Sequence, residues 1–429
     1  MKQRRADLIV RHCKELVTAA NPPGRPKRAE ELEELGVIED GALAVSGDRI
    51  IFVGKTSDLD GEIQWDEATV VIDAPDGVLM PGFVDPHTHA VFGGSRVEEF
   101  VQRLRGASYL EILESGGGIL KTVRETRGLT AEELASISRP YLDNMLLHGT
   151  TTVEIKSGYG LDKENELKML EAIRILQGTH PLEVVPTFMG AHAIPPEYRE
   201  DPQGYVEAVV DMLPDARRCS EFCDVFCERG AFSLEQSRRI LTEAKGLGFK
   251  LKIHAGEFSD IGGAELAAEL GATSADHLDH VSEEGMAKLA EKGVVAVLLP
   301  SVPFFLGEEH RTPALKMLQA GVPLALATDF NPGSSPTENM QLIVALACIK
   351  LRMSPEAAIN CATINAAYAI DRAGEVGSLE MGKRADFLIL DLPSYRYLPY
   401  RFGINHVRTV VKGGRVVVDG GRIINHRRA

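Results

Sequence analysis

The sequence is poor in several features that mark particular classes of protein. Aromatic residues make up 6% of the 429 residues, tryptophan occurs once, and 47 basic residues stand against 62 acidic ones, for a formal net charge of −15. A nucleic-acid-binding domain would present a basic face, so this balance predicts no nucleic-acid partner. It does not exclude an anionic small molecule, because one arginine can reverse the field inside a pocket.

Cysteine is scarce too, and its spacing does not predict a zinc knuckle. Three of the six cysteines, Cys219, Cys223 and Cys227, recur every four residues without the C-x-x-C pair of a zinc ribbon. The run CDVFC is typical of a buried strand, where a thiol behaves as a small apolar side chain. We therefore predict structural cysteines and no disulfide framework.

Long apolar runs are also missing. No segment approaches the roughly 20 apolar residues of a membrane-spanning helix. The basic start MKQRRADLIVRHCKEL lacks the apolar core and cleavage site of a secretory signal. These features predict a cytoplasmic protein without a membrane partner. Because a chain of this length buries enough surface to fold unaided, any bound metal is expected to be catalytic.

Both ends of the chain carry strand patterns. β-Branched residues alternate or cluster between Gly and Asp turns in residues 7–18, 41–54 and 68–80, and again in 377–392 and 407–425. The KGGR run at 412–415 has the glycines of a hairpin turn. Since chain ends often lie close together, we predict one small β-domain formed from residues 1–80 and 379–429.

Residues 81–378 show a different pattern. Short apolar runs such as TTTVEIKSG, KLKIHAGE and PLALATDF alternate with segments that are apolar at helical spacing, such as SLEQSRRILTEAKGLG and SEEGMAKLAEKG. Eight such strands with intervening helices predict an α/β fold, a (β/α)8 TIM barrel. A doubly wound sheet is the competing fold, but no G-x-G-x-x-G follows the first strand.

Polar residues gather at the carboxyl ends of these predicted strands. Barrel enzymes assemble their active sites at that rim, so the residues are candidates for a common site. They are His87, His89, Glu154, Lys156, His192, His254, Glu257, His277 and Asp329.

His87 and His89 stand two apart on a predicted strand, so both imidazoles are expected on one face. Two neutral imidazoles placed in this way can chelate a divalent ion, although an H-x-H pair also occurs where histidines only form hydrogen bonds. His254 and Asp329 each end another buried strand. Three histidines and one carboxylate suit Zn²⁺ or Fe²⁺.

The segments LMPGFVDPHTH, KIHAGE, DHLDH and ATDFNPG, in this order, resemble the amidohydrolase superfamily across essentially the whole chain. The resemblance implies a distorted barrel joined to a small β-sandwich that both chain ends build. It also implies a set of metal ligands, namely His87, His89, His254 and Asp329.

Many members of that superfamily hold a second metal ion through a carboxylated lysine on the fourth strand. The corresponding segment here, EVVPTFMGAHAI, contains no lysine. Lys156 lies on an earlier strand, where an ion pair with Glu154 would account for it. We therefore expect one divalent ion, Zn²⁺ or Fe²⁺.

Glu257 follows His254 by three residues, and a carboxylate there can move protons between water and a leaving nitrogen. By position alone it is equally an N-cap or a surface charge. The H-x-x-E spacing matches the superfamily's deaminases and cyclic-amide hydrolases, which favours catalysis. His277 is expected to share this work, and the sequence leaves open which of the two is the primary base.

Longer segments, including HAVFGGSRVEEF, EIKSGYGL, TFMGAHA and ATDFNPGSSP, resemble one branch of the superfamily. That branch opens the ring of imidazolone-5-propionate with water, giving N-formimidoyl-glutamate in histidine degradation. The resemblance implies a homodimer and a metal-activated water that attacks the cyclic amide carbonyl, with His192 helping to stabilise the developing oxyanion. It implies that the substrate is bound by Arg96, Tyr159, His192, Glu257, Asn331, Gly333 and Ser334.

Arg96 is the natural clamp for the substrate's carboxylate, because a guanidinium binds a carboxylate through two hydrogen bonds. A surface arginine paired with Glu98 or Glu99 is the alternative. The glycines at 116–118 lack the G-K-[ST] ending of a phosphate loop, so a mobile loop near the pocket mouth is predicted there.

Two other functions remain open. A purine or pyrimidine deaminase would use the same metal ligands, although Arg96 would then have no carboxylate to bind. A non-catalytic barrel scaffold would typically have lost metal ligands, and all four are present.

Overall fold

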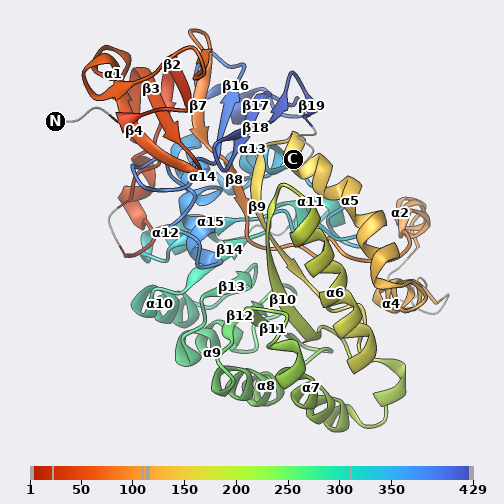
Figure 1. The fold of residues 1–429 in the computed structure, drawn as a ribbon. Helices are drawn as coiled ribbons and strands as arrows, with labels where there is room; N and C mark the ends of the chain where they lie inside the picture. The colour runs from red at the N-terminus through yellow and green to blue at the C-terminus, as the bar shows by residue number, and fades with distance from the viewer. Residues whose placement is uncertain (1–3, 22–23, 108–110, 112–115, 310–311, 425–429) are drawn as a thin grey trace.

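Eight parallel strands form one of the two main sheets in the computed structural model, which describes residues 4–21, 24–107, 111, 116–309 and 312–424 (Figure 1). Each strand pairs with the next strand in the chain, and helices surround them, which confirms the predicted (β/α)8 barrel. The barrel strands are β8 (Phe83–Asp85), β9 (Thr150–Lys156), β10 (Glu183–Ala191), β11 (Phe222–Cys227), β12 (Lys250–Ala255), β13 (Ser274–His277), β14 (Val295–Leu298) and β15 (Leu324–Leu326).

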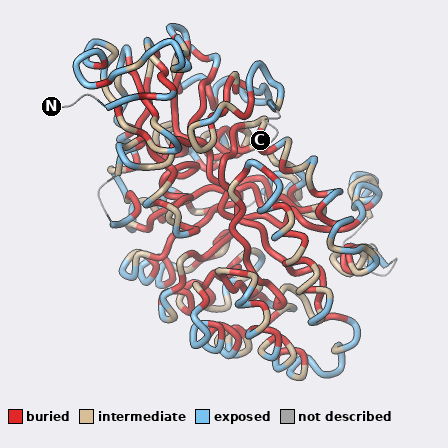
Figure 2. The backbone as a smooth tube through the Cα atoms, in the orientation of Figure 1, coloured by how far each residue is buried: buried red, intermediate tan, exposed pale blue. Residues whose placement is uncertain are grey.

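A helix follows each of the strands β9 to β13, and the apolar spacing predicts the last three of them. They are α6 (Lys163–Thr179), α7 (Pro202–Ala216), α8 (Leu234–Gly246), α9 (Gly263–Leu270) and α10 (Glu283–Lys292). Figure 2 shows buried backbone along the barrel strands and exposed backbone on the outer turns of these helices. The strands are buried on both faces because side chains fill the interior and helices cover the outside.

The barrel closes just beyond the first and last strands. Thr88 forms a parallel bridge with Phe330. On either side of it, the Asp329 N–H donates to the His87 carbonyl over 3.0 Å and the His89 N–H donates to the Phe330 carbonyl over 2.9 Å. The closure therefore places the H-x-H pair beside Asp329, although 240 residues separate His89 from Asp329 in the chain.

The second main sheet combines the two chain ends, as predicted for the small β-sandwich. Its order is β19-β18-β17-β16-β7-β2-β3-β4, with β6 beside β2. The join is the antiparallel pairing of β7 with β16, in which Pro81 lies opposite Phe387. Its strands are β2 (Leu8–Val17), β3 (Val37–Ser46), β4 (Arg49–Lys55), β6 (Val70–Asp73), β7 (Val78–Pro81), β16 (Phe387–Leu390), β17 (Val407–Lys412), β18 (Arg415–Asp419) and β19 (Arg422–Ile423).

The KGGR hairpin is also confirmed. Lys412 pairs with Arg415 across the turn, and Gly413 and Gly414 have φ values of 54° and 74°. A two-residue turn with positive φ at both central residues suits the twist of the two strands. The predicted domain boundaries, after residue 80 and before residue 379, stay predictions.

The remaining elements are short strands and helices around these two sheets. They are β1 (Arg4–Arg5), β5 (Ile63–Gln64), α1 (Thr56–Glu62), α2 (Val97–Leu104), α4 (Ile119–Arg127), α5 (Ala131–Leu147), α11 (Ser301–Leu306), α12 (Ala314–Gln319), α13 (Met340–Leu351), α14 (Pro355–Cys361), α15 (Ile364–Ala369), α16 (Tyr397–Tyr400) and the 3-10 turns Ala29–Glu33 and Pro196–Tyr198. All six cysteines are free thiols, as expected. In the described ranges, every helix is too short or too polar to span a bilayer.

Candidate metal centre

Five buried side chains meet at the carboxyl ends of the barrel strands. His87, His89, His254, His277 and Asp329 are each at most 3% exposed. His254 and His277 lie on β12 and β13, as predicted. His87 and His89 differ slightly from the prediction, because β8 ends at Asp85 and the two histidines follow it, after a proline that has no N–H for the sheet.

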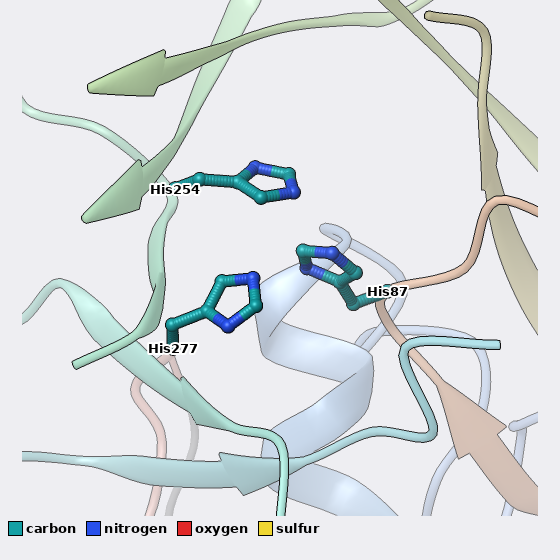
Figure 3. A group of neighbouring side chains, drawn as sticks. All are labelled: His87, His254 and His277. Carbon is teal, nitrogen blue, oxygen red and sulfur yellow. The ribbon is translucent and has the colours of Figure 1, made fainter. Parts of the chain in front are cut away.

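These side chains form two overlapping groups with the spacing of metal ligands. In His87, His89 and Asp329, one ligand atom from each lies within 4.8 Å of the others, and the same holds for His87, His254 and His277. Asp329 Oδ1 is 3.4 Å from His87 Nε2 and 3.6 Å from His89 Nε2. Figure 3 shows the imidazole rings of the second group facing a common space.

Several ring nitrogens in these groups are buried without a hydrogen-bond partner. They include His87 Nε2, His254 Nε2 and His277 Nδ1. Burial of an unpaired polar atom is unfavourable, and a bound cation would supply the missing partner. Burial also lowers the pKa of His87 and of His89 well below the usual value, so both rings are neutral, the form that binds metal.

The carboxylate of Asp329 also suits a metal site. Burial raises the pKa of Asp329 well above its usual value, because no cation in the described structure is close enough to offset the desolvation. A divalent ion at its side would reverse that preference. The donor set of neutral imidazoles and one carboxylate therefore fits a divalent metal ion.

The backbone is strained at two of these positions. Asp329 has a φ of 49° and His277 a φ of 75°, and Leu278 follows with 62°. Residues other than glycine enter this left-handed region at a cost of roughly 1–2 kcal/mol. Such strain persists where the surrounding structure imposes it, and it is common at functional sites.

The two predicted proton-transfer groups lie together. His277 Nε2 is 3.6 Å from Glu257 Oε2. Burial, followed by the charges of Asp329 and Asp279, raises the pKa of Glu257 well above its usual value. The loop that carries Glu257 is held by buried Glu228, which accepts hydrogen bonds from the N–H groups of Phe258 and Ser259.

The five buried side chains, His87, His89, His254, His277 and Asp329, are called the ligand cluster below. A cavity of about 120 Å³ opens beside this cluster. Its walls include five of the predicted substrate-binding residues besides Glu257, namely Arg96, Tyr159, His192, Asn331 and Ser334. Gly333 does not line it but lies behind Arg96, where a Cβ atom would come within 2.2 Å of the guanidinium Nη1. The absence of a side chain at Gly333 thus leaves room for Arg96.

Arg96 forms a local ion pair and also lines the cavity. Its Nε donates to Glu99 Oε2 over 2.9 Å, so the expected local ion pair is present. The same side chain is 18% exposed and lines the cavity. The glycines at 116–118 lead into α4, whose first residue, Ile119, also lines the cavity, while residues 112–115 lie outside the described chain.

His192 has a defined hydrogen-bonding state. Its Nδ1 lies 3.0 Å from the Gly158 carbonyl, which can only accept, so Nδ1 carries the hydrogen. Burial lowers the pKa of His192 to about 3. The neutral ring therefore offers Nε2 as an acceptor and not as the donor expected for an oxyanion.

Buried Glu166 holds the loop that carries Gly158 and Tyr159. Its carboxylate accepts hydrogen bonds from the N–H groups of Gly158 (3.1 Å), Gly160 (2.8 Å) and Leu161 (2.9 Å). Glu166 was not predicted from the sequence, nor were Asp224 and Asp276, which contact His254 and His87. A charged residue inside an otherwise apolar strand is the signal that marks Asp224.

We expect Glu166→Gln to raise the KM for substrate about tenfold while bound metal stays unchanged. The side-chain amide of the new glutamine presents N–H hydrogens to the N–H groups of the loop that carries Gly158 and Tyr159. The loop therefore shifts, and the free energy of unfolding falls by about 1–3 kcal/mol. Steady-state kinetics, metal analysis and thermal unfolding measure the three quantities. Glu164→Gln, on the exposed face of the same helix, is the control, and a KM equal to that of the control would contradict the expectation.

Comparison with known proteins agrees with this geometry. The model of the amidohydrolase family matches residues 78–417. Among curated relatives, the imidazolonepropionase of Alkaliphilus oremlandii is 51% identical over 97% of this chain and 99% of its own length. That of Shouchella clausii is 50% identical over 97% of this chain and 94% of its own.

Solved structures share the fold at low sequence identity. An adenosine deaminase from Xanthomonas campestris with bound zinc superposes with a TM-score of 0.75 at 20% identity, covering 99% of this chain and 95% of its own. A mutant atrazine chlorohydrolase from Arthrobacter aurescens, complexed with zinc and atraton, gives 0.69 at 17% identity, covering 97% and 96%. The family model and the full-length relatives together place this chain in the amidohydrolase family, among the imidazolonepropionases.

Proposed function

We propose that this chain opens the ring of imidazolone-5-propionate with water, giving N-formimidoyl-L-glutamate in histidine degradation. Relatives named imidazolonepropionase are about 50% identical to this chain over nearly its whole length. The observation that carries the proposal is the cavity itself, which joins the ligand cluster and Glu257 to Arg96. A hydrolytic centre and a carboxylate clamp are what a small cyclic amide with a propionate tail requires.

His87, His89, His254 and Asp329 would hold one divalent ion, Zn²⁺ or Fe²⁺. When bound there, the ion would supply a Lewis acid that lowers the pKa of a water and polarises the ring carbonyl. A single ion is supported by the absence of a lysine on β10 and by the ion pairs of Lys156, whose Nζ is 2.8 Å from both Glu154 and Asp224. A lysine engaged in this way is not available for carboxylation.

The protons are handled by Glu257 and His277. As the water oxygen bonds to the carbonyl carbon, Glu257 takes the proton that the water releases. The ring C–N bond then breaks, and the proton passes to the departing nitrogen from Glu257 or from His277, 3.6 Å away. One water is consumed, one C–N bond is lost and one C–O bond is gained.

Two further residues orient the substrate. The neutral His192 accepts through Nε2, so it suits an N–H group of the imidazolone ring. Tyr159, buried at 4% exposure, lines the same cavity as Arg96 and would donate its hydroxyl hydrogen to the substrate's carboxylate. These contacts hold the ring carbonyl toward the ligand cluster.

We expect Arg96→Ala to raise the KM about 100-fold with little change in kcat, because truncating a buried charge partner costs about 2–5 kcal/mol. Steady-state kinetics with imidazolone-5-propionate measures both constants. Arg105→Ala, an exposed arginine at the end of the same helix, is the matched control. An unchanged KM would show that the propionate is bound elsewhere.

The direct test is an ultraviolet assay of imidazolone-5-propionate ring opening, run beside a metal analysis of the same sample. We expect turnover and about one divalent ion per chain. Ammonia release from guanine or cytosine, with imidazolone-5-propionate untouched, would instead establish a deaminase. The homodimer stays a prediction, which light scattering in solution would check.

A further inference from the structure

A cluster of charged side chains is buried inside the barrel, below the ligand histidines. Its five members are completely inaccessible to solvent, and they come from four of the barrel strands, β9, β11, β12 and β13. They are Glu154, Lys156, Asp224, Lys252 and Asp276. None of them lines the cavity, and the proposed reaction uses none of them directly.

Lys156 is the centre of this cluster. Its Nζ lies 2.8 Å from Glu154 Oε1, 2.8 Å from Asp224 Oδ2 and 3.7 Å from Asp276 Oδ2. The ion pair with Glu154 that the sequence suggested is present, but it is one of three contacts. Asp224 on β11 and Asp276 on β13 thus share one ammonium group with Glu154.

Both carboxylates extend this contact to a ligand histidine. Asp276 Oδ2 is hydrogen-bonded to His87 Nδ1 at 2.6 Å. Asp224 Oδ2 lies 3.1 Å from His254 Nδ1, although the direction of that contact does not make a hydrogen bond. In both histidines the other nitrogen, Nε2, is buried and unpartnered on the side of the ligand cluster.

These contacts bear on the tautomer and orientation of the His87 and His254 rings. An ionised carboxylate only accepts hydrogen bonds, so His87 Nδ1, which is bonded to Asp276, carries the hydrogen and His87 Nε2 keeps its lone pair. The charge of Asp224, 3.1 Å from His254 Nδ1, favours the same tautomer in His254. Partners of this kind fix the tautomer and the orientation of metal-binding histidines. Without Lys156, Asp224 would lose the one lysine that contacts it within the described residues, and Asp276 would lose one of two, the other being Lys252 at 3.4 Å.

We propose that Lys156 is a positioning residue of the metal centre, which fixes His254 through Asp224 and His87 through Asp276. The proposal rests on the proposed function only in that these two histidines bind the ion. The role of Lys156 differs from that of a carboxylated lysine, because Lys156 acts as a cation behind the ligands and does not touch the metal.

The test is the zinc affinity of Lys156→Met, measured by competition with a chromogenic chelator. We expect binding roughly 10–100-fold weaker than in the parent chain, the effect typical of removing partners behind metal ligands. The absorption spectrum of the cobalt-substituted protein should also change, because the two imidazoles are no longer held in one orientation. Neither readout needs a substrate, so failure of the proposed reaction would leave this test intact.

Lys27→Met is the matched control, because Lys27 is also a buried lysine but lies far from the ligands, bonded to Asn360 Oδ1 and the Glu34 carbonyl. It should lose stability while keeping parental zinc affinity. If Lys156→Met binds zinc as tightly as Lys27→Met, the proposal is wrong. If Lys156→Met does not fold, Asp276→Asn is measured in its place, and parental affinity there would equally overturn the proposal.

Discussion

Replacement of His254 by alanine is expected to remove the bound metal and the activity together. His254 Nε2 is buried without another partner, so the ion would lose a ligand that no neighbouring group replaces. Bound metal should fall from about one ion per chain to near zero after dialysis. Turnover should fall by roughly 10⁴-fold or more, because the Lewis acid supplies several kcal/mol of transition-state stabilisation.

Atomic absorption and the ring-opening assay measure the two losses on the same sample. His180→Ala is the control, since His180 is also a buried histidine but hydrogen-bonds Asp143 on the outside of the barrel. It should lower stability while metal content stays at the parental level. A His254→Ala protein that retained stoichiometric metal would remove His254 from the ligand set.

Replacement of Glu257 by glutamine is also expected to abolish turnover, but with the metal retained. Glutamine keeps the shape of the side chain but cannot take the proton from the attacking water. The loss should be about 10²–10⁴-fold in kcat, the usual contribution of general acid–base catalysis. Equal metal loss in Glu257→Gln and His254→Ala would contradict this division of roles.

The variant His277→Ala, measured in parallel, decides whether Glu257 or His277 is the primary base, which the sequence left open. His277 contacts Glu257 and also belongs to a group with ligand spacing, together with His87 and His254. A loss of turnover with full metal content would make it a proton-transfer group. A loss of metal would make it a ligand, and comparison of the two kcat values would identify the primary base.

Local patterns in the sequence predict much of the fold. The apolar runs at residues 82–89, 250–257 and 323–330 contain strands β8, β12 and β15, and helices α8, α9 and α10 follow from apolar spacing and terminal glycines. These patterns are readable because strand and helix periodicity are properties of neighbouring residues. The KGGR turn was predictable for the same reason.

The candidate site could be predicted in part. His254 and Asp329 were found because each lies at the end of an apolar run that contains a strand, and parallel strands bring such ends to one rim. Asp329 itself follows β15, which ends at Leu326. Asp224, Asp276 and Glu166 were missed, because their importance depends on which histidine or loop lies across from them. His192 was placed at the site, but its hydrogen-bonding state needed the position of the Gly158 carbonyl.

The sequence by itself determined the kind of chemistry, because residue types and their places at strand ends specify which donors are available. Only the tertiary structure decided how those donors combine. Closure of the barrel at Thr88 and Phe330 sets Asp329 beside His87 and His89, and the barrel interior sets Lys156 between Asp224 and Asp276. Such contacts join residues far apart in the chain, so no local pattern encodes them, and packing of the strands alone creates them.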